Sequence, residues 1–130
     1  MKQIIKQWKN GNYNYVYNQL KKINYKYTLD NFERDFSKIN SEKRFCYLIY
    51  LLSKENTPYN TILLCELLIY TDTFFFEIHS VIKMFIQQSL NLYPFNTVIM
   101  NWILDTYDNH PDSPFSNDEL NLYKCKLNNF

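Results

Sequence analysis

The chain has 130 residues, of which 46% are hydrophobic, 18% are aromatic and 21% are charged, and its formal net charge is +1. This composition excludes a disordered chain, and the length predicts one domain over residues 1–130. The single glycine, Gly11, excludes glycine-rich phosphate loops, dinucleotide-binding loops and nucleophile elbows, and the near-neutral charge argues against a general nucleic-acid-binding protein.

The first half of the chain predicts four helical segments, of which residues 2–9 form only a short helix and residues 29–36 either a helix or a turn of helix. Apolar residues recur at helical spacing over residues 2–9, 13–24 and 29–36, and Gly11 interrupts the first two runs. Asn40 and Ser41 form an N-cap signal for a fourth helix that ends near Lys54. On that helix we expect four side chains to face inward: Phe45, Leu48, Ile49 and Leu52.

The second half predicts longer and more apolar helices. Thr57 and Pro58 start a helix to about residue 70, and its two apolar stripes predict burial on two sides. One face of this helix should hold Ile62, Leu63, Glu66, Leu67 and Tyr70. The longest periodic run spans residues 72–92 and includes Phe75, and a further helix should span residues 96–108. After a proline-rich loop, Ser116 and Glu119 form a capping box for a last helix that includes Leu127.

These patterns predict an all-α fold of six or seven helices in antiparallel hairpins. Residues 13–17 are the only competing strand, and no partner strand accompanies them. The helix starts near residues 58 and 96 lie about 38 residues apart, close to the period of tetratricopeptide (TPR) and HEAT units. Residues 89–96 (SLNLYPFN) also resemble the end of a TPR helix. We therefore expect either a small TPR- or HEAT-like bundle or a short solenoid.

Charge is distributed unevenly along the chain. Residues 1–50 contain ten basic and four acidic side chains, whereas residues 51–130 contain four basic and nine acidic ones. The acidic half predicts a face that attracts a basic partner.

The reactive side chains offer no recognisable catalytic or metal-binding pattern, so we expect a protein that is not an enzyme and has no cofactor or metal. Cys46, Cys65 and Cys125 are widely spaced and predict free, buried thiols in a reducing compartment. His79 should be packed in the bundle with a hydrogen-bond partner, and His110 should belong to a polar turn. The first residues lack a secretory signal and the longest apolar stretch is too short to span a bilayer, which predicts a cytoplasmic protein without membrane contact.

Five segments together resemble small helical immunity proteins of bacterial contact-dependent growth inhibition and polymorphic-toxin systems. They are residues 47–55 (YLIYLLSKE), 65–68 (CELL), 89–96 with His79 ahead of them, 102–104 (WIL) and 110–119 (HPDSPFSNDE). The last segment is the most specific, and the similarity covers residues 45–130. A glycine that is common before the histidine-bearing helix is missing here, where residues 71–74 read TDTF.

The resemblance implies a cytoplasmic, non-enzymatic protein that binds the C-terminal domain of one cognate toxin, often a nuclease, and occludes its active site or substrate surface. Because loops commonly carry recognition, we place the toxin-binding surface around the proline-rich loop. Its candidate residues are Asp105, Tyr107, Asp108, Asp112, Asp118 and Glu119.

Two alternatives remain open. The first is a TPR-like adaptor that binds a short peptide in a concave groove. The second, which we rank lower, is direct contact of the basic N-terminal half with nucleic acid through Lys2, Lys6, Lys9, Lys21, Lys22 and Lys26.

Overall fold

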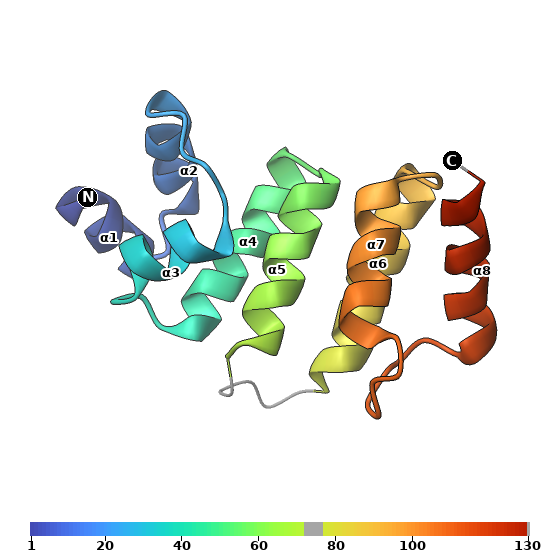
Figure 1. Cartoon of the computed structure of the whole chain (residues 1–130). Helices are drawn as coiled ribbons and strands as arrows, with labels where there is room; N and C mark the ends of the chain where they lie inside the picture. Colours follow the sequence, from blue (N-terminus) through green and yellow to red (C-terminus); the bar gives the residue numbers. More distant parts are fainter. Residues whose placement is uncertain (72–76, 130) are drawn as a thin grey trace.

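The structure is a computed structural model that describes residues 1–71 and 77–129, and this part of the chain forms eight helices and no strand (Figure 1). The predicted all-α fold is confirmed, with more helices than the six or seven expected. The helices are α1 (Lys2–Lys9), α2 (Tyr13–Lys22), α3 (Leu29–Phe36), α4 (Ser41–Lys54), α5 (Pro58–Ile69), α6 (Ile78–Leu92), α7 (Thr97–Tyr107) and α8 (Asn117–Asn128).

Short polar side chains begin most of these helices. The side chains of Thr28, Asn40, Thr57, Asn96 and Ser116 each accept a hydrogen bond from a backbone N–H in the first helical turn. Such caps satisfy donors that a helix cannot pair internally. All three predicted cap signals, at residues 40–41, 57–58 and 116–119, therefore start helices at the predicted places, and residues 13–17 are helical.

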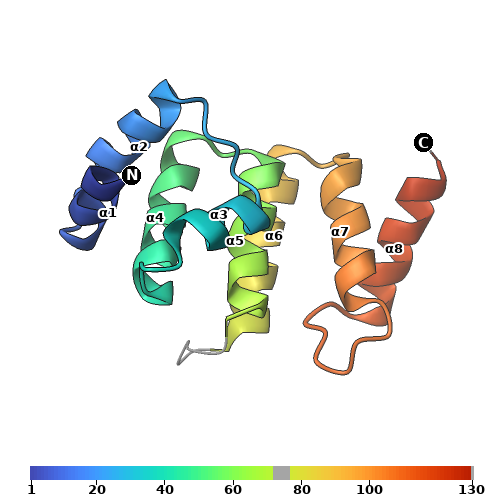
Figure 2. The same cartoon turned by 60° about the vertical axis from the view of Figure 1, so that its left-hand side comes forward.

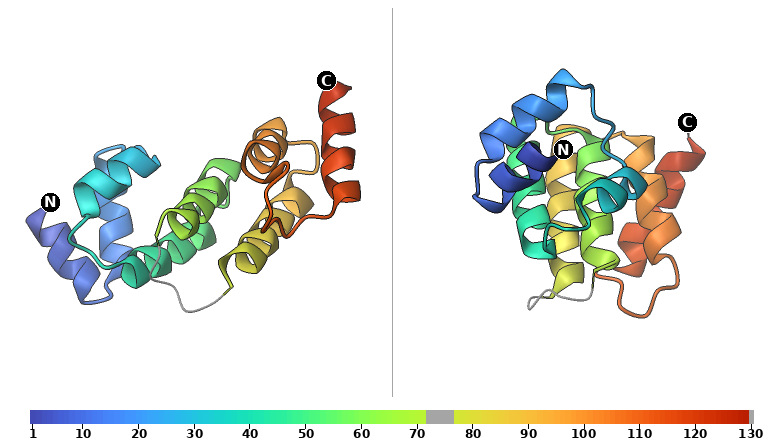
Figure 3. Two further views of the ribbon diagram at one scale, coloured as in Figure 1. Left: turned by 60° about the horizontal axis from the view of Figure 1, so that its bottom comes forward. Right: turned by 90° about the vertical axis from the view of Figure 1, so that its left-hand side faces the viewer.

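The helices form a curved array in which α3, α5 and α7 lie on the inner side and α4 and α6 on the outer side (Figure 3). α5 is the central helix and contacts α3, α4, α6 and α7. Eight of its twelve residues are buried, which confirms the predicted burial on two sides. Figure 2 shows that α3 lies across α4 and α5 instead of running alongside them.

An aromatic cluster closes the N-terminal end of the array. The Trp8 ring centroid lies 4.7 Å from that of Phe36 and 4.5 Å from that of Tyr47, and Trp8 Nε1 donates a 3.0 Å hydrogen bond to the Lys43 carbonyl. Rings at this spacing attract each other beyond their burial from water. One side chain of α1 thus joins α3 and α4.

Several sequence expectations need correction. α2 ends at Lys22, so Ile23 lies outside the helix and is 58% exposed. Ile49 and Tyr70 are exposed and do not face the core. α6 begins at Ile78 because Glu77 has an extended backbone and caps the helix with its own carboxylate. The expected earlier part of that run, residues 72–76 with Phe75, lies outside the described residues.

The three cysteines are free thiols, but only Cys65 is buried, whereas Cys46 and Cys125 are exposed. Within the described ranges, no helix has the length and apolar character needed to cross a bilayer.

Candidate partner-binding surface

The loop between α7 and α8 is anchored by buried aromatic rings. The chain leaves α7 at Tyr107 and turns at Asn109, whose φ of 64° lies in the left-handed region that asparagine tolerates. Phe115 is buried with its ring centroid 5.6 Å from that of Tyr107 and 6.1 Å from that of Tyr123. These packed rings fix both ends of the loop, so the polar residues between them are presented on a defined framework.

Lys83 of α6 ties this loop to the rest of the array. Its Nζ donates hydrogen bonds to the Pro114 carbonyl at 3.0 Å and to Glu119 Oε1 at 2.9 Å, and it lies 5.5 Å from the Phe115 ring centroid. Glu119 in turn accepts from the Ser116 backbone N–H, which completes the predicted capping box. One cation therefore holds the end of the loop and the start of α8 together.

The two histidines lie close together, His79 in the first turn of α6 and His110 in the loop. His79 Nδ1 and Tyr107 Oη share a 2.8 Å hydrogen bond, which confirms the expectation of a packed, hydrogen-bonded histidine. The His110 ring centroid lies 5.6 Å from that of His79, and His110 Nδ1 accepts a 3.0 Å hydrogen bond from the Asp112 backbone N–H. His110 is thus part of an exposed turn, as expected.

Three of the six candidate residues are exposed carboxylates that form no ion pair with another described residue. They are Asp105 in the last turn of α7, Asp112 in the loop and Asp118 in the first turn of α8. Asp108 is paired with Lys124 at 3.0 Å, and Glu119 with Lys83. The structure thus brings five predicted carboxylates to one end of the array, and three of them retain an uncompensated charge.

Tyr107 requires a correction because its side chain is fully buried. It lies beneath the loop, where it contacts Phe115 and the two histidines, and it has no surface to offer a partner. Burial raises the pKa of its phenol well above the usual value, so it stays neutral. Tyr107 is therefore a residue that supports the loop from beneath and not one that contacts a partner.

A recess of about 510 Å³ opens beside the loop. Its lining includes two carboxylates, from Glu77 and Asp112, together with the hydroxyls of Ser80 and Ser113. Carboxylates and hydroxyls are suitable acceptors for the N–H groups of lysine and arginine. This surface can therefore accept a basic side chain of another protein.

Glu66 and Glu77, the two glutamates on otherwise apolar stretches, have separate partners. Glu66 Oε1 accepts a 3.2 Å hydrogen bond from Trp102 Nε1, and Glu77 accepts from the backbone N–H of His79. Burial raises the pKa of Glu66, although the Trp102 hydrogen bond acts in the opposite direction. In the part of the chain that the structure describes, no three His, Cys, Asp or Glu side chains are placed to hold a metal ion.

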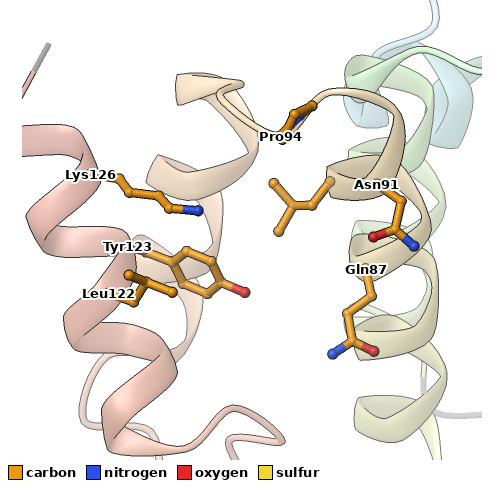
Figure 4. Close-up of a pocket in the computed structure, with 7 residues that line it drawn as sticks. Gln87, Asn91, Pro94, Leu122, Tyr123 and Lys126 are labelled. Carbon is orange, nitrogen blue, oxygen red and sulfur yellow. The ribbon is translucent and has the colours of Figure 1, made fainter.

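Lys83 and Leu122 were not among the residues predicted from the sequence. Lys83 interrupts the apolar run Val81-Ile82-Lys83-Met84-Phe85, and a cation in such a run is the signal of a buried or half-buried partner. Leu122 is an apolar residue on the polar side of α8, where it is 50% exposed. It lines a groove of about 500 Å³ between α8 and α6 (Figure 4).

Comparison of the chain with protein-family models, with curated proteins and with solved structures finds no match.

Proposed function

We propose that this protein is an immunity protein that binds a cognate toxin domain, for example a nuclease domain, and blocks its active site or substrate surface. The proposal extends the sequence resemblance of residues 45–130. The observation that supports it best is the group of uncompensated carboxylates, Asp105, Asp112 and Asp118, around a loop that buried rings and Lys83 hold in place.

Such a surface suits a basic partner for two physical reasons. A group of exposed carboxylates accelerates the encounter with a positively charged protein, by about tenfold or more at low salt. A loop that is already anchored before binding loses little conformational entropy when the partner arrives. The recess beside Asp112 would then receive a lysine or arginine side chain of the toxin.

The decisive experiment uses the product of the neighbouring reading frame, where we expect the toxin domain to be encoded. Co-expression should restore growth of cells that produce the toxin domain, and the two purified proteins should form a stable complex. The proposal would be refuted if the toxin domain remained toxic during co-expression and remained unbound when mixed with this protein.

Charge reversal then locates the surface. The variant Asp105→Lys/Asp112→Lys should reduce the association rate constant by about tenfold and flatten its dependence on salt, because the carboxylates act mainly on encounter. Glu42→Lys, which reverses an exposed carboxylate on α4 at the other end of the array, is the control for a single charge reversal away from the loop and should leave the rate unchanged. Equal rates for all three proteins would exclude this loop as the binding surface.

The second candidate, a peptide-binding adaptor, is favoured by one observation. The side of α5 that faces away from its outer neighbours α4 and α6 has an exposed or half-buried strip of Tyr59, Ile62, Glu66 and Tyr70. Aromatic rings around a carboxylate on the inner side of a curved array could hold a short basic peptide. Binding of many unrelated peptides, abolished by Tyr70→Ala and unaffected by reversal at Asp112, would favour the adaptor.

A further inference from the structure

α8 has a stripe of three residues that the fold does not use. Asp118, Leu122 and Lys126 are spaced at i, i+4 and i+8, so they lie along one face of the helix. Leu122 is 50% exposed, Asp118 is exposed and Lys126 is half-buried. Neither charged residue forms an ion pair with any described residue. The stripe therefore presents a negative, an apolar and a positive group, in that order, to the surroundings.

This stripe borders the groove between α8 and α6. Leu122, Tyr123 and Lys126 form one wall, and α6 and the turn after it supply Leu90 and Pro94 on the other wall (Figure 4). The groove holds about 500 Å³, and the side chain of Leu92 is exposed near the same end of α6. Apolar surface of this kind, bordered by polar groups, is typical of an interaction site.

The order of charges makes the stripe complementary to itself. Leu122 lies at the middle of α8, which spans Asn117–Asn128. When two copies of α8 pack antiparallel about a two-fold axis through Leu122, the two leucines meet at the axis. Asp118 of each copy then faces Lys126 of the other. A two-fold interface needs this property, because the same patch must fit its own image.

We propose that two copies of this chain associate through α8, so that each α8 packs against its counterpart and borders the groove beside α6 of the other copy. The groove fits a second copy better than a basic toxin, because Lys126 is the only charged residue among the described residues that line it, and its other polar side chains are the amides of Gln87 and Asn91 and the hydroxyl of Tyr123. Asp118 belongs both to this stripe and to the candidate toxin-binding carboxylates, whereas Asp105 of α7 and Asp112 of the loop lie outside the stripe and stay free for a toxin when α8 is paired.

Sedimentation over a range of concentrations tests the contact. The wild-type chain should show a monomer–dimer equilibrium, and Leu122→Glu should be monomeric because it places two carboxylates at the axis. Ile23→Glu is the matched control, since Ile23 is a comparably exposed apolar residue at the opposite end of the chain, and it should dimerise like the wild type. A monomeric wild-type protein, or a Leu122→Glu variant that still dimerises, would overturn the proposal.

A charge-swap experiment tests the antiparallel register. Asp118→Lys and Lys126→Glu should each weaken homodimerisation by about tenfold or more, because two attractive pairs become two repulsive pairs. An equimolar mixture of the two single variants should form a heterodimer, and the double variant Asp118→Lys/Lys126→Glu should recover the homodimer. Asp105→Lys, with the same charge change off the stripe, should have no effect.

Failure of the mixed variants to associate would refute the register, even if the wild type dimerises. Circular dichroism of each variant verifies that α8 remains folded, and rescue in the mixture cannot arise from unfolding. If the wild type is monomeric and Leu122→Glu fails to bind the toxin domain, the groove belongs to the toxin and self-association is overturned. Unchanged toxin binding by a monomeric Leu122→Glu variant would leave the proposed function intact.

Discussion

Replacing Lys83 with methionine removes the cation that joins α6 to the loop and α8 while keeping an unbranched apolar side chain that is only one atom shorter. The change deletes a 2.9 Å ion pair with Glu119 and a 3.0 Å hydrogen bond to the Pro114 carbonyl. The Lys83 and Glu119 side chains are 26% and 31% exposed, so solvent screening reduces the ion pair to about 1 kcal/mol. An unpaired carbonyl costs about 1 kcal/mol more. We therefore expect the free energy of unfolding to fall by about 2 kcal/mol.

Urea denaturation of four proteins measures the ion pair separately. The set contains the wild type, Lys83→Met, Glu119→Gln and the double variant, and glutamine at position 119 preserves the capping box. The coupling energy from this double-mutant cycle should be about 1 kcal/mol. Additive effects of the two single variants, within about 0.3 kcal/mol, would show that Lys83 and Glu119 are not coupled and would refute the electrostatic reasoning.

The same pair predicts a dependence of stability on pH. Burial by itself would raise the pKa of Glu119, but the hydrogen bonds from the Ser116 N–H and from Lys83 outweigh it, so the pKa lies below its usual value. A carboxylate with a lowered folded pKa stabilises the fold above its unfolded pKa of about 4.3 and loses this contribution as the pH falls through the folded value. Glu119→Gln should therefore flatten the acidic limb of the stability profile, and an unchanged limb would contradict the assignment.

Three further predictions concern buried polar groups. Ser89→Ala should leave the free energy of unfolding unchanged or raise it by up to about 1 kcal/mol, because Ser89 Oγ is buried without a hydrogen-bond partner among the described residues; a clear loss in urea denaturation would contradict this. Tyr107→Phe should lower the free energy of unfolding by about 1 kcal/mol and shift the nuclear magnetic resonance signals of the His79 ring, since it removes their 2.8 Å hydrogen bond; unchanged ring signals would disprove that bond. Burial raises the pKa of Tyr27 to about 12. Its contribution to stability is therefore complete below its unfolded pKa of about 10 and disappears as the pH rises through about 12. In an ultraviolet titration, Tyr27→Phe should show one fewer phenol that ionises near this pH than the wild type.

Helix positions were predictable where a short polar cap precedes an apolar run. Asn40, Thr57 and Ser116 each start a helix where expected, because the cap and the periodic pattern act within a few residues of each other. The faces of helices were harder to predict. Tyr70 continues the apolar spacing of α5 but is 72% exposed, because it lies at the end of the helix. Whether a neighbouring helix covers such a position depends on the packing of the whole array.

The candidate surface was predictable in its charge but not in its pairing. Sequence placed the carboxylates near the proline-rich loop, and the structure brings them there. Local sequence could not reveal that Lys83, 36 residues before Glu119, neutralises that carboxylate, or that packing buries Tyr107. Such long-range contacts depend on how α6, α7 and α8 pack, which no short motif encodes. The carboxylates that form no ion pair with another described residue could be identified only once the structure showed which of the others are paired with a lysine.

The distribution of charge along the array gives the surface a direction. The basic first 50 residues build α1 to most of α4 at one end, and the acidic remainder builds α5 to α8 at the other (Figure 1). A net charge of +1 therefore conceals a molecule with opposite charges at its two ends. A basic partner is repelled by the first end and attracted to the second, which favours productive orientation before contact. Because a Debye length of about 8 Å at physiological salt is shorter than the array, each end acts on a partner by its local charge and not by the sum. Reversal of Asp112 should therefore slow association far more than the same change at Glu42, although both alter the net charge equally.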